Sequence, residues 1–344
     1  MDTNALSSQK LHFVVEENIP YMRGTLEPYG TVEYLSSDAI THSVAERADA
    51  VLVRTRTRCD AALLQDTPVR LVATATIGTD HIDLPWCEAH GIRVANAPGC
   101  NAPAVAQYVL TSVATLINRP ISESRIGIVG VGHVGTIVER WALSLGMEVM
   151  RCDPPRQRAE GGEGWYSLEE LAEKCDIITF HTPLTRSGED STYHLADASF
   201  FAKCRRAPII INAARGPVVE TQALIDAICS GMVYQAVIDT WEGEPAISRE
   251  LLRYTTIATP HIAGYSRQGK MRATRMVLDA VSETFGLPHI EFEGEEPTPV
   301  MKRVKVPQLL WSYDPYIDDN ALRSDPEAFE RLRDTYNLRS EPMK

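Results

Sequence analysis

Short apolar segments alternate with amphipathic segments along the first third of the chain. Apolar runs predict buried strands at residues 10–16, 31–35, 50–54, 71–76 and 92–95. Between them, residues 43–48 and 61–65 have the spacing of amphipathic helices. This alternation is typical of a parallel sheet flanked by helices.

A second series of the same kind begins after a long apolar helix that we predict over residues 102–118. Strands are predicted at 125–129, 148–152, 177–180, 208–212, 236–239 and 256–258, with helices at 134–145, 167–174 and 221–230 among them. Six such strands are what a doubly wound nucleotide-binding domain requires. The helix over 102–118 lies where the chain would cross from one domain to the other.

The last part of the chain has a different character. A helix is predicted over 268–285, and residues 286–306, rich in Pro, Glu and Gly, are expected to form a connection. Residues 313–338 are polar and charged, with one helical stretch around 326–335. We interpret this tail as a small appended element or a subunit contact.

Composition narrows the class of protein. The chain has 344 residues, enough for two domains, and its net charge of -12 argues against nucleic acid as a partner. Its seven cysteines are scattered without a C-x-x-C pair, which favours reduced thiols. Since no apolar run reaches membrane-spanning length, we expect a soluble, cytoplasmic protein without a membrane partner. His81, His181, His194 and His261 stand in separate segments, so no metal site is expected.

A glycine motif follows the strand at 125–129. Gly130 permits a tight turn, Gly132 lets the backbone approach a pyrophosphate, and Gly135 lets helix and strand pack closely. The helix N-terminus then presents its free N–H groups to the phosphates. Asp153, eighteen residues after Gly135, is expected to accept hydrogen bonds from the ribose hydroxyls, which favours NAD over NADP. The predicted cofactor loop also includes His133 and Val134, with His133 expected to be solvated and not catalytic.

Three further residues follow strands of the second series. Arg215, Glu244 and His261 each come shortly after a predicted strand, and residues beyond the carboxyl ends of parallel strands share one edge of the sheet. Oxidation of an alcohol needs a base for the hydroxyl proton, a group that orients the base, and a cation for the substrate. Histidine, glutamate and arginine suit these three roles.

The segments around these residues, NAARG (212–216), DTWEGEP (239–245) and TPHIAG (259–264), resemble the signatures of the D-isomer-specific 2-hydroxyacid dehydrogenases. The resemblance implies that Arg215, Glu244 and His261 are catalytic. It also implies two doubly wound parallel-sheet domains and a small C-terminal dimerisation element. The substrate domain, flavodoxin-like, would comprise residues 1–100 and 262–285; the Rossmann-type NAD-binding domain, 101–261; and the dimerisation element, 286–344.

A closer likeness, to one group within this family, rests on ENIP (17–20), IGTDH (77–81), APGCN (97–101), CDPPR (152–156), HTPL (181–184), HIAGY (261–265) and YDP (313–315). It implies a homodimer that oxidises a small phosphorylated 2-hydroxy acid for pyridoxal phosphate synthesis. The implied substrate contacts are Thr55, Thr76 and Tyr265. The implied further NAD contacts are Thr182, Ala213, Ala214, Arg215, Asp239 and Gly264.

A phosphorylated substrate needs an additional cation, and Arg54, beside Thr55 at a strand end, is our hypothesis for it, ahead of Lys270 and Arg272. Two alternatives stay open at this stage. The first is an enzyme of the same class that is specific for another acid, such as 3-phosphoglycerate, glycerate or lactate, and the second is a non-catalytic NAD-sensing scaffold on the same fold. The shape of the substrate pocket decides the first question, and a sequence does not display it.

Overall fold

The computed structural model describes residues 10–293 and 300–342, and contacts divide them into two compact units. The first unit runs up to Asn101 and resumes at Gln268, continuing to residue 293. The second unit comprises Ala102–Arg267 and the residues from 300 onward. The return to the first unit thus lies at Gln268, whereas the resemblance places it at residue 262. The described residues after 286 are divided between the two units and do not form a third.

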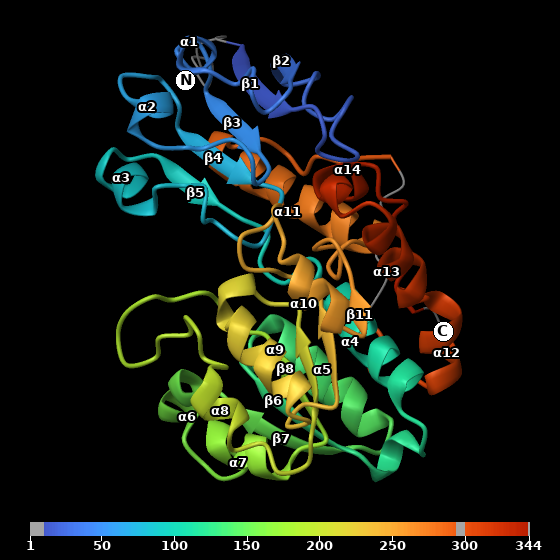
Figure 1. Cartoon of the computed structure of the whole chain (residues 1–344). Helices are drawn as coiled ribbons and strands as arrows, with labels where there is room; N and C mark the ends of the chain where they lie inside the picture. Colours follow the sequence, from blue (N-terminus) through green and yellow to red (C-terminus); the bar gives the residue numbers. More distant parts are fainter. Residues whose placement is uncertain (1–9, 294–299, 343–344) are drawn as a thin grey trace. The chain divides into compact units, whose positions relative to one another are not determined.

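The first unit contains a five-stranded parallel sheet. Its strand order is β2-β1-β3-β4-β5, which is the flavodoxin-like doubly wound order. Figure 1 shows these strands in blue to cyan. This confirms the expected fold class, and the strands are β1 (Leu11–Glu16), β2 (Gly30–Leu35), β3 (Ala50–Val53), β4 (Leu71–Thr74) and β5 (Arg93–Ala95).

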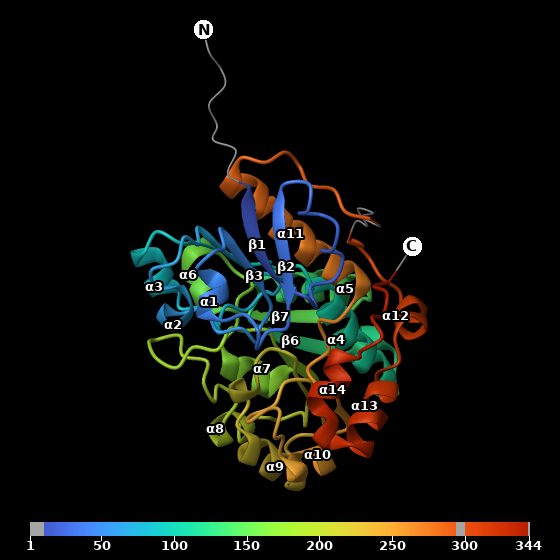
Figure 2. The same ribbon diagram turned by 90° about the horizontal axis from the view of Figure 1, so that it is seen from above.

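Both faces of this sheet are covered, which explains why its central strands are continuously apolar. On one face Val14, Val51 and Val72 pack with side chains from α1 (His42–Ala45), α2 (Ala61–Leu64) and α3 (Leu84–Ala89). On the other face Phe13 and Leu52 pack against α11 (Arg267–Phe285), the long helix that Figure 2 shows beside β1 and β2.

The second unit contains a six-stranded parallel sheet with the order β11-β10-β9-β8-β6-β7. A single parallel bridge between Arg151 and Trp165 lies beyond β7, where the classic dinucleotide-binding order has a full strand. β7 and β8 lie on opposite sides of β6, so the topological switch point is at the glycine turn. The strands are β6 (Arg125–Val129), β7 (Glu148–Cys152), β8 (Ile177–Phe180), β9 (Ile209–Asn212), β10 (Gln235–Ile238) and β11 (Ile257–Ala258).

Helices cover both faces of this sheet as well. One cluster joins Ile126, Ile128 and Val237 to α4 (Ala102–Leu116) and α5 (His133–Ser144). The cluster on the other face joins Ile178, Ile210 and Ile238 to a second set of helices. These are α7 (Leu168–Lys174), α8 (Ala198–Phe201), α9 (Thr221–Cys229) and α10 (Arg249–Tyr254), and α6 (Pro154–Glu160) follows β7. None of the helices in the described ranges is long and apolar enough to cross a membrane.

The C-terminal part of the second unit is more helical than the sequence pattern predicts. It forms α12 (Val306–Ser312), α13 (Pro315–Ser324), a 3-10 turn (Pro326–Ala328) and α14 (Phe329–Asp334), drawn in red in Figures 1 and 2, and α12 and α13 contact α4. The helical stretch predicted around 326–335 is present as the 3-10 turn and α14, whereas α12 and α13 were not predicted. α12 and α13 bury few apolar side chains and expose Trp311 and Ile317, so they lack the clear apolar stripe that identifies a surface helix.

Candidate active site

The glycine turn between β6 and α5 is crowded at two glycines and open at the third. Gly130 has a φ of 85°, and a Cβ there would lie 2.8 Å from the carbonyl carbon of His181. A Cβ at Gly135 would lie 2.1 Å from the carbonyl oxygen of Gly130. At Gly132 no described atom lies within 4 Å of the Cβ position. The turn therefore packs tightly inward and leaves its central peptide open to a ligand.

The start of α5 suits an anion. The helix begins at His133, and none of the described side chains caps its N-terminus, so its first N–H groups are available for a phosphate. His133 itself is exposed, as expected, and Val134 is half-buried against the helix core.

Asp153 lies at the end of β7 beside this turn. Its Oδ2 accepts a hydrogen bond from the N–H of Val131 at 2.8 Å, and its Oδ1 accepts one from the N–H of Arg156 at 3.0 Å. Arg156 in turn donates to the carbonyl oxygen of Val131 and to Thr136 Oγ1. The carboxylate thus braces the turn, and its predicted contact with the ribose stays a prediction.

Two buried polar atoms beside the turn have no hydrogen-bond partner within the described part of the chain. They are His181 Nδ1 and Thr182 Oγ1, which directly follow β8. The other ring nitrogen of His181 lies 3.0 Å from Thr179 Oγ1, and burial lowers the pKa of His181 to about 3, so the ring is neutral. Unpaired polar atoms beside Gly130 of the glycine turn fit a bound dinucleotide, which would supply their missing partners.

The predicted base and its partner are in contact. His261 Nδ1 lies 2.7 Å from Glu244 Oε1, and the other carboxylate oxygen of Glu244 accepts the N–H of Trp241 at 3.2 Å. Burial raises the pKa of the Glu244 carboxyl, but the hydrogen bond and charge of His261, the Trp241 N–H and the charge of Arg333 outweigh it, so the net pKa is lowered. Glu244 therefore carries a negative charge next to the imidazole.

The loops that carry the three predicted catalytic residues are joined through their backbones. A Cβ at Gly216, directly after Arg215, would lie 2.0 Å from the carbonyl oxygen of Trp241, so only glycine permits this approach. Trp241 Nε1 donates to the carbonyl oxygen of Thr259 at 2.9 Å, which ties the Glu244 loop to the His261 loop. The close contact at Gly216 was not anticipated from the sequence, because nothing in a single sequence shows what a glycine faces.

Arg215 is half-buried and its loop is organised by Asn212, at the end of β9. Asn212 Nδ2 donates to the carbonyl oxygen of Arg215 at 3.0 Å, and its Oδ1 accepts the N–H of Ala214 at 3.2 Å. Ala213 is half-buried and Ala214 is buried. The short side chains at these two positions leave room beside the strand end, and their predicted contacts with NAD stay predictions.

A second histidine–glutamate pair supports the same loop. His194 Nε2 lies 2.7 Å from Glu242 Oε1, and the His194 N–H donates to the carbonyl oxygen of Pro217 at 2.7 Å. The second carboxylate oxygen of Glu242 accepts the N–H of Thr221 at 2.8 Å. Since one Glu242 oxygen binds the His194 side chain and the other binds the Thr221 backbone, this pair has a structural role that the sequence did not reveal.

The remaining predicted residues of the second unit lie around the His261 loop. The side chain of Asp239 is 1% exposed and accepts a hydrogen bond from Thr259 Oγ1 at 2.7 Å, so it shapes the loop. Gly264 and Tyr265 are half-buried, and the Tyr265 ring packs edge-on against Tyr336 with centroids 5.8 Å apart. The roles assigned to these three residues toward NAD and substrate stay predictions.

The predicted substrate residues of the first unit follow β3 and β4. Arg54 is half-buried, with Nη1 3.9 Å from Glu16 Oε1, and Thr55 is exposed. The Thr76 hydroxyl lies 2.7 Å from Thr74 Oγ1. Of the weaker candidates, Arg272 donates from Nε to the carbonyl oxygen of Cys100 at 2.7 Å, and Lys270 is half-buried on α11.

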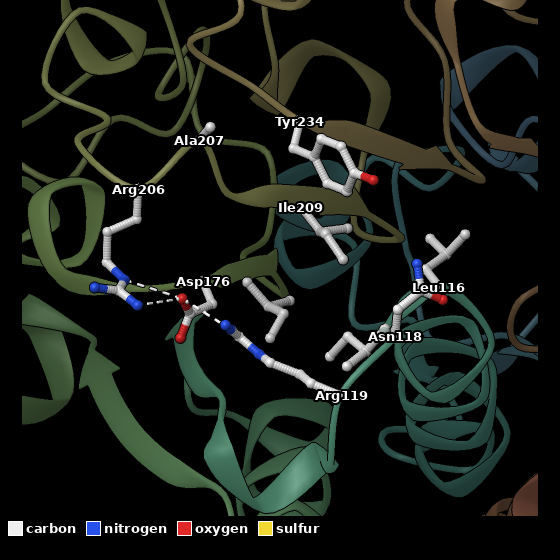
Figure 3. A pocket seen from close by; sticks show the side chains of 10 residues that line it. Leu116, Asn118, Arg119, Asp176, Arg206, Ala207, Ile209 and Tyr234 are labelled. Atoms are coloured by element: carbon white, nitrogen blue, oxygen red, sulfur yellow. Dashed lines mark hydrogen bonds and ion pairs between the residues drawn. The ribbon is translucent and has the colours of Figure 1, made fainter.

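A cavity of about 420 Å³ lies in the second unit at the opposite edge of the sheet, where the strands begin. Figure 3 shows Arg119 and Arg206 converging on Asp176, whose Oδ1 lies 3.0 Å and 2.7 Å from their Nη2 atoms. The other oxygen, Oδ2, accepts the Arg125 N–H at 2.8 Å. Burial raises the pKa of Asp176, but these hydrogen bonds and charges outweigh it and lower the pKa overall. Both cations lie against one carboxylate, and the predicted catalytic residues follow the other ends of the strands, so this cavity is not the candidate active site.

No group of three or more His, Cys, Asp or Glu side chains that could hold a metal ion occurs in the described ranges. The residues that fit a cofactor are those around the glycine turn and after β8. The arrangement as a whole places a histidine–carboxylate pair and an arginine on neighbouring strand ends of a sheet whose switch point fits a dinucleotide.

Comparison with known proteins agrees with this geometry. Residues 105–263 match the family model described as D-isomer specific 2-hydroxyacid dehydrogenase, NAD binding domain. The chain is 45% identical over 339 residues to an erythronate-4-phosphate dehydrogenase of Bacteroides thetaiotaomicron, a match covering 96% of this chain and 97% of the relative. It is 40% identical over 351 residues to that of Pseudomonas fluorescens, covering 95% and 92%.

Solved structures show the same fold. The D-lactate dehydrogenase from Aquifex aeolicus, complexed with NAD and lactic acid, superimposes with a TM-score of 0.67 at 22% identity, covering 80% of this chain and 96% of that one. The family model, which is that of an NAD-binding domain, confirms NAD as the cofactor. The chain belongs to the erythronate-4-phosphate dehydrogenase family, within the NAD-dependent D-isomer specific 2-hydroxyacid dehydrogenases.

Proposed function

We propose that this chain oxidises 4-phospho-D-erythronate to 3-hydroxy-2-oxo-4-phosphooxybutanoate with NAD, in the synthesis of pyridoxal 5′-phosphate. Relatives that match nearly the whole chain carry the name erythronate-4-phosphate dehydrogenase. The observation that carries the chemical part of the proposal is the 2.7 Å hydrogen bond between His261 and Glu244 at the carboxyl edge of the nucleotide-binding sheet.

In this proposal His261 is the general base. Its Nδ1–H donates to Glu244, which leaves Nε2 free to take the proton of the substrate C2 hydroxyl. The negative charge of Glu244 stabilises the imidazolium that forms, and Arg215 binds the substrate carboxylate with its planar guanidinium. The glycine turn and the residues after β8 would hold NAD, which would supply the acceptor for the C2 hydride and its two electrons as the C2–O bond becomes a carbonyl.

The first unit is proposed to bind the rest of the substrate. Thr55 and Thr76 would contact its hydroxyl groups, and Arg54 would bind the phosphate. Arg54 lies near the buried Glu16 carboxylate, which holds the guanidinium at the end of β3 while leaving part of it exposed. Tyr265, on the loop that follows His261, is the substrate contact proposed from the second unit.

We also propose that the protein is a homodimer whose subunits meet through α12 and α13. Four large apolar side chains on these helices are exposed, with Trp311 at 86% and Ile317 at 68%, beside Leu310 and Tyr316. Such a group on adjacent helices supports a protein–protein contact. The double variant Trp311→Glu with Ile317→Glu should sediment as a monomer, while Tyr234→Glu, at another exposed aromatic residue, should not change the mass. A wild-type monomer at micromolar concentration would contradict the proposal.

A cytoplasmic location is proposed from the cysteines. All seven are free thiols, six of them buried, which suits a reducing compartment. Fractionation of the source cells tests this proposal, and recovery outside the cytoplasm would contradict it.

The function is tested by NADH formation with 4-phospho-D-erythronate beside 3-phosphoglycerate and D-glycerate. We expect a clear preference for the first acid and loss of turnover by at least about 100-fold in His261→Ala, with NADH binding retained. Better turnover of another acid would support the oxidation of a 2-hydroxy acid with His261 as base, and would reject 4-phospho-D-erythronate as the substrate. No turnover of any acid, with NADH still bound, would favour a non-catalytic NAD-sensing protein.

A further inference from the structure

The backbone of the two residues that follow His261 is held from both sides by buried charged side chains. The Asp239 carboxylate accepts the N–H of Ile262 at 2.8 Å and that of Ala263 at 3.0 Å. The carbonyl oxygens of the same two residues accept hydrogen bonds from the Arg339 guanidinium, that of Ile262 at 3.1 Å. Asp239 is 1% exposed and Arg339 is 8% exposed. The N–H groups of these two residues are thereby fixed by Asp239, and their carbonyl oxygens by Arg339.

All three nitrogens of the Arg339 guanidinium are engaged. Nε donates to Gln107 Oε1 at 3.1 Å, Nη1 donates also to the Tyr336 hydroxyl at 3.1 Å, and Nη2 donates also to the carbonyl oxygen of Ala104 at 3.2 Å. The guanidinium carbon lies 4.4 Å from the centre of the Tyr313 ring. Burial of a cation costs free energy unless it is fully paired, and this set of acceptors provides the pairing.

The backbone on either side of Arg339 reinforces the contact. The Arg267 N–H donates to the carbonyl oxygen of Arg339 at 2.9 Å, and Ser266 forms an isolated parallel bridge with Arg339. The Ser266 hydroxyl donates to Glu341 Oε1 at 2.7 Å. The C-terminal segment therefore runs alongside the loop that carries the proposed base.

The loop needs such support because of the conformation of its first residue. His261 has a φ of 56°, in the left-handed region that side chains other than glycine seldom adopt. A side chain other than glycine persists in this region only where the surrounding structure enforces it. The hydrogen bonds made by Asp239 and Arg339 to the next two peptides provide that enforcement.

We propose that Arg339 is a positioning residue for the proposed general base: by fixing the Ile262 and Ala263 peptides it holds the His261 imidazole against Glu244. This inference rests on the proposed function, in which His261 takes the substrate proton. It gives the C-terminal segment a part in the chemistry, in addition to any part in subunit contact. A base displaced by about 1 Å loses about 100-fold in rate, so a small relaxation of the loop is measurable.

The test compares Arg339→Lys and Tyr336→Phe with Arg331→Lys, an exposed arginine of α14 paired with Asp325. Lysine keeps the charge but lacks the fork that reaches both carbonyl oxygens, and Tyr336→Phe removes one hydrogen bond to the guanidinium. We measure thermal unfolding, the Kd for NADH, kcat and KM across pH, and hydrogen exchange of residues 259–266 by mass spectrometry.

For Arg339→Lys we expect kcat to fall about 10- to 100-fold and exchange of the loop to accelerate about 10-fold, while KM and the Kd for NADH change by less than about 3-fold. The acid limb of the kcat profile should shift, because the contact between His261 and Glu244 loosens. Tyr336→Phe should give a smaller change of the same kind, and Arg331→Lys none.

Unchanged kcat and loop exchange in folded Arg339→Lys would overturn the proposal, as would a loss of activity that only follows the loss of folded protein. If Arg339→Lys does not fold, Tyr336→Phe decides by the same criteria. If the wild type oxidises no 2-hydroxy acid, the proposed function fails, and hydrogen exchange of the loop alone tests the role of Arg339. Faster exchange in Arg339→Lys then supports the proposal that Arg339 fixes the loop, and unchanged exchange overturns it.

Discussion

Gly132→Ala should weaken NADH binding at nearly unchanged stability, whereas Gly135→Ala should lower stability. Both glycines belong to the same turn, yet a Cβ at Gly135 would lie 2.1 Å from the carbonyl oxygen of Gly130, whereas none of the described atoms lies within 4 Å of the Cβ position at Gly132. Gly132 also has a φ of -75°, which alanine adopts. One glycine is thus required by packing, and the other is left for the cofactor.

The expected magnitudes follow from these distances. At Gly135 the distance from the Cβ to the carbonyl oxygen of Gly130 would be about 1.3 Å less than the 3.4 Å at which ordinary contact begins. The helix must therefore move away from the turn and strand. Overpacking of this size costs about 3 kcal/mol, or about 6–12 °C in Tm for a unit of this size. At Gly132 the methyl group enters open space and restricts the unfolded chain, which changes stability by less than about 1 kcal/mol. It occupies the place that a pyrophosphate approaches, so the Kd for NADH should rise at least about 10-fold, or about 1.4 kcal/mol.

The assay pairs differential scanning fluorimetry without ligand with titration of NADH fluorescence. Gly132→Ala should keep the wild-type Tm and bind NADH weakly, and Gly135→Ala should lose Tm. An unchanged Kd for NADH in Gly132→Ala would refute the assignment of this peptide to the cofactor. Equal losses of Tm in the two variants would refute the distinction between them.

Three further results are expected. Gly216→Ala places a Cβ 2.0 Å from the carbonyl oxygen of Trp241 and should lower kcat about 100-fold with the Kd for NADH retained; an unchanged kcat would contradict it. Glu244→Gln keeps an acceptor for His261 but removes the charge that stabilises imidazolium, so kcat/KM should fall about 10- to 100-fold and the acid limb of the pH profile should move to lower pH; an unmoved limb speaks against this role. The pKa of His181 is lowered by burial from its ordinary 6.5 to about 3, so below pH 6.5 the unfolded chain takes up a proton that the folded chain does not. Urea unfolding between pH 7 and pH 5 should therefore show the wild type losing up to about 2 kcal/mol more than His181→Gln, and equal losses would exclude the effect.

The central strands were predictable because they are buried on both faces and therefore continuously apolar, as in β3, β4, β8 and β9. β6, β7 and β8 have the predicted bounds, and the others differ by one or two residues. The candidate site was predictable for a related reason. Strand ends of a parallel sheet converge, so Arg215, Glu244 and His261 could be assigned to one edge before any distance was known.

What the sequence did not reveal depends on contacts between distant segments. Arg339 stands in a polar tail, where an arginine is ordinarily solvated, and its acceptors on residues 104, 107, 262 and 263 lie far away in the chain. The helices α12 and α13 were missed because exposed Trp311 and Ile317 interrupt the polar side that a surface helix is expected to have. Neither a buried arginine nor a helix with an unusual exposed face has a periodic signal.

The backbone contact at Gly216 has a consequence for how new specificity is obtained. Because two backbones touch there, the spacing between the Arg215 and Glu244 loops is set by Gly216 and not by the side chains around it, and the reacting groups form one fixed unit. Three of the four residues proposed to contact the rest of the acid, Arg54, Thr55 and Thr76, stand on the first unit, which has its own core, and the fourth, Tyr265, stands on the second. Directed evolution toward other 2-hydroxy acids should therefore collect its substitutions in the first unit and at Tyr265, and leave Arg215, Gly216, Glu244 and His261 unchanged.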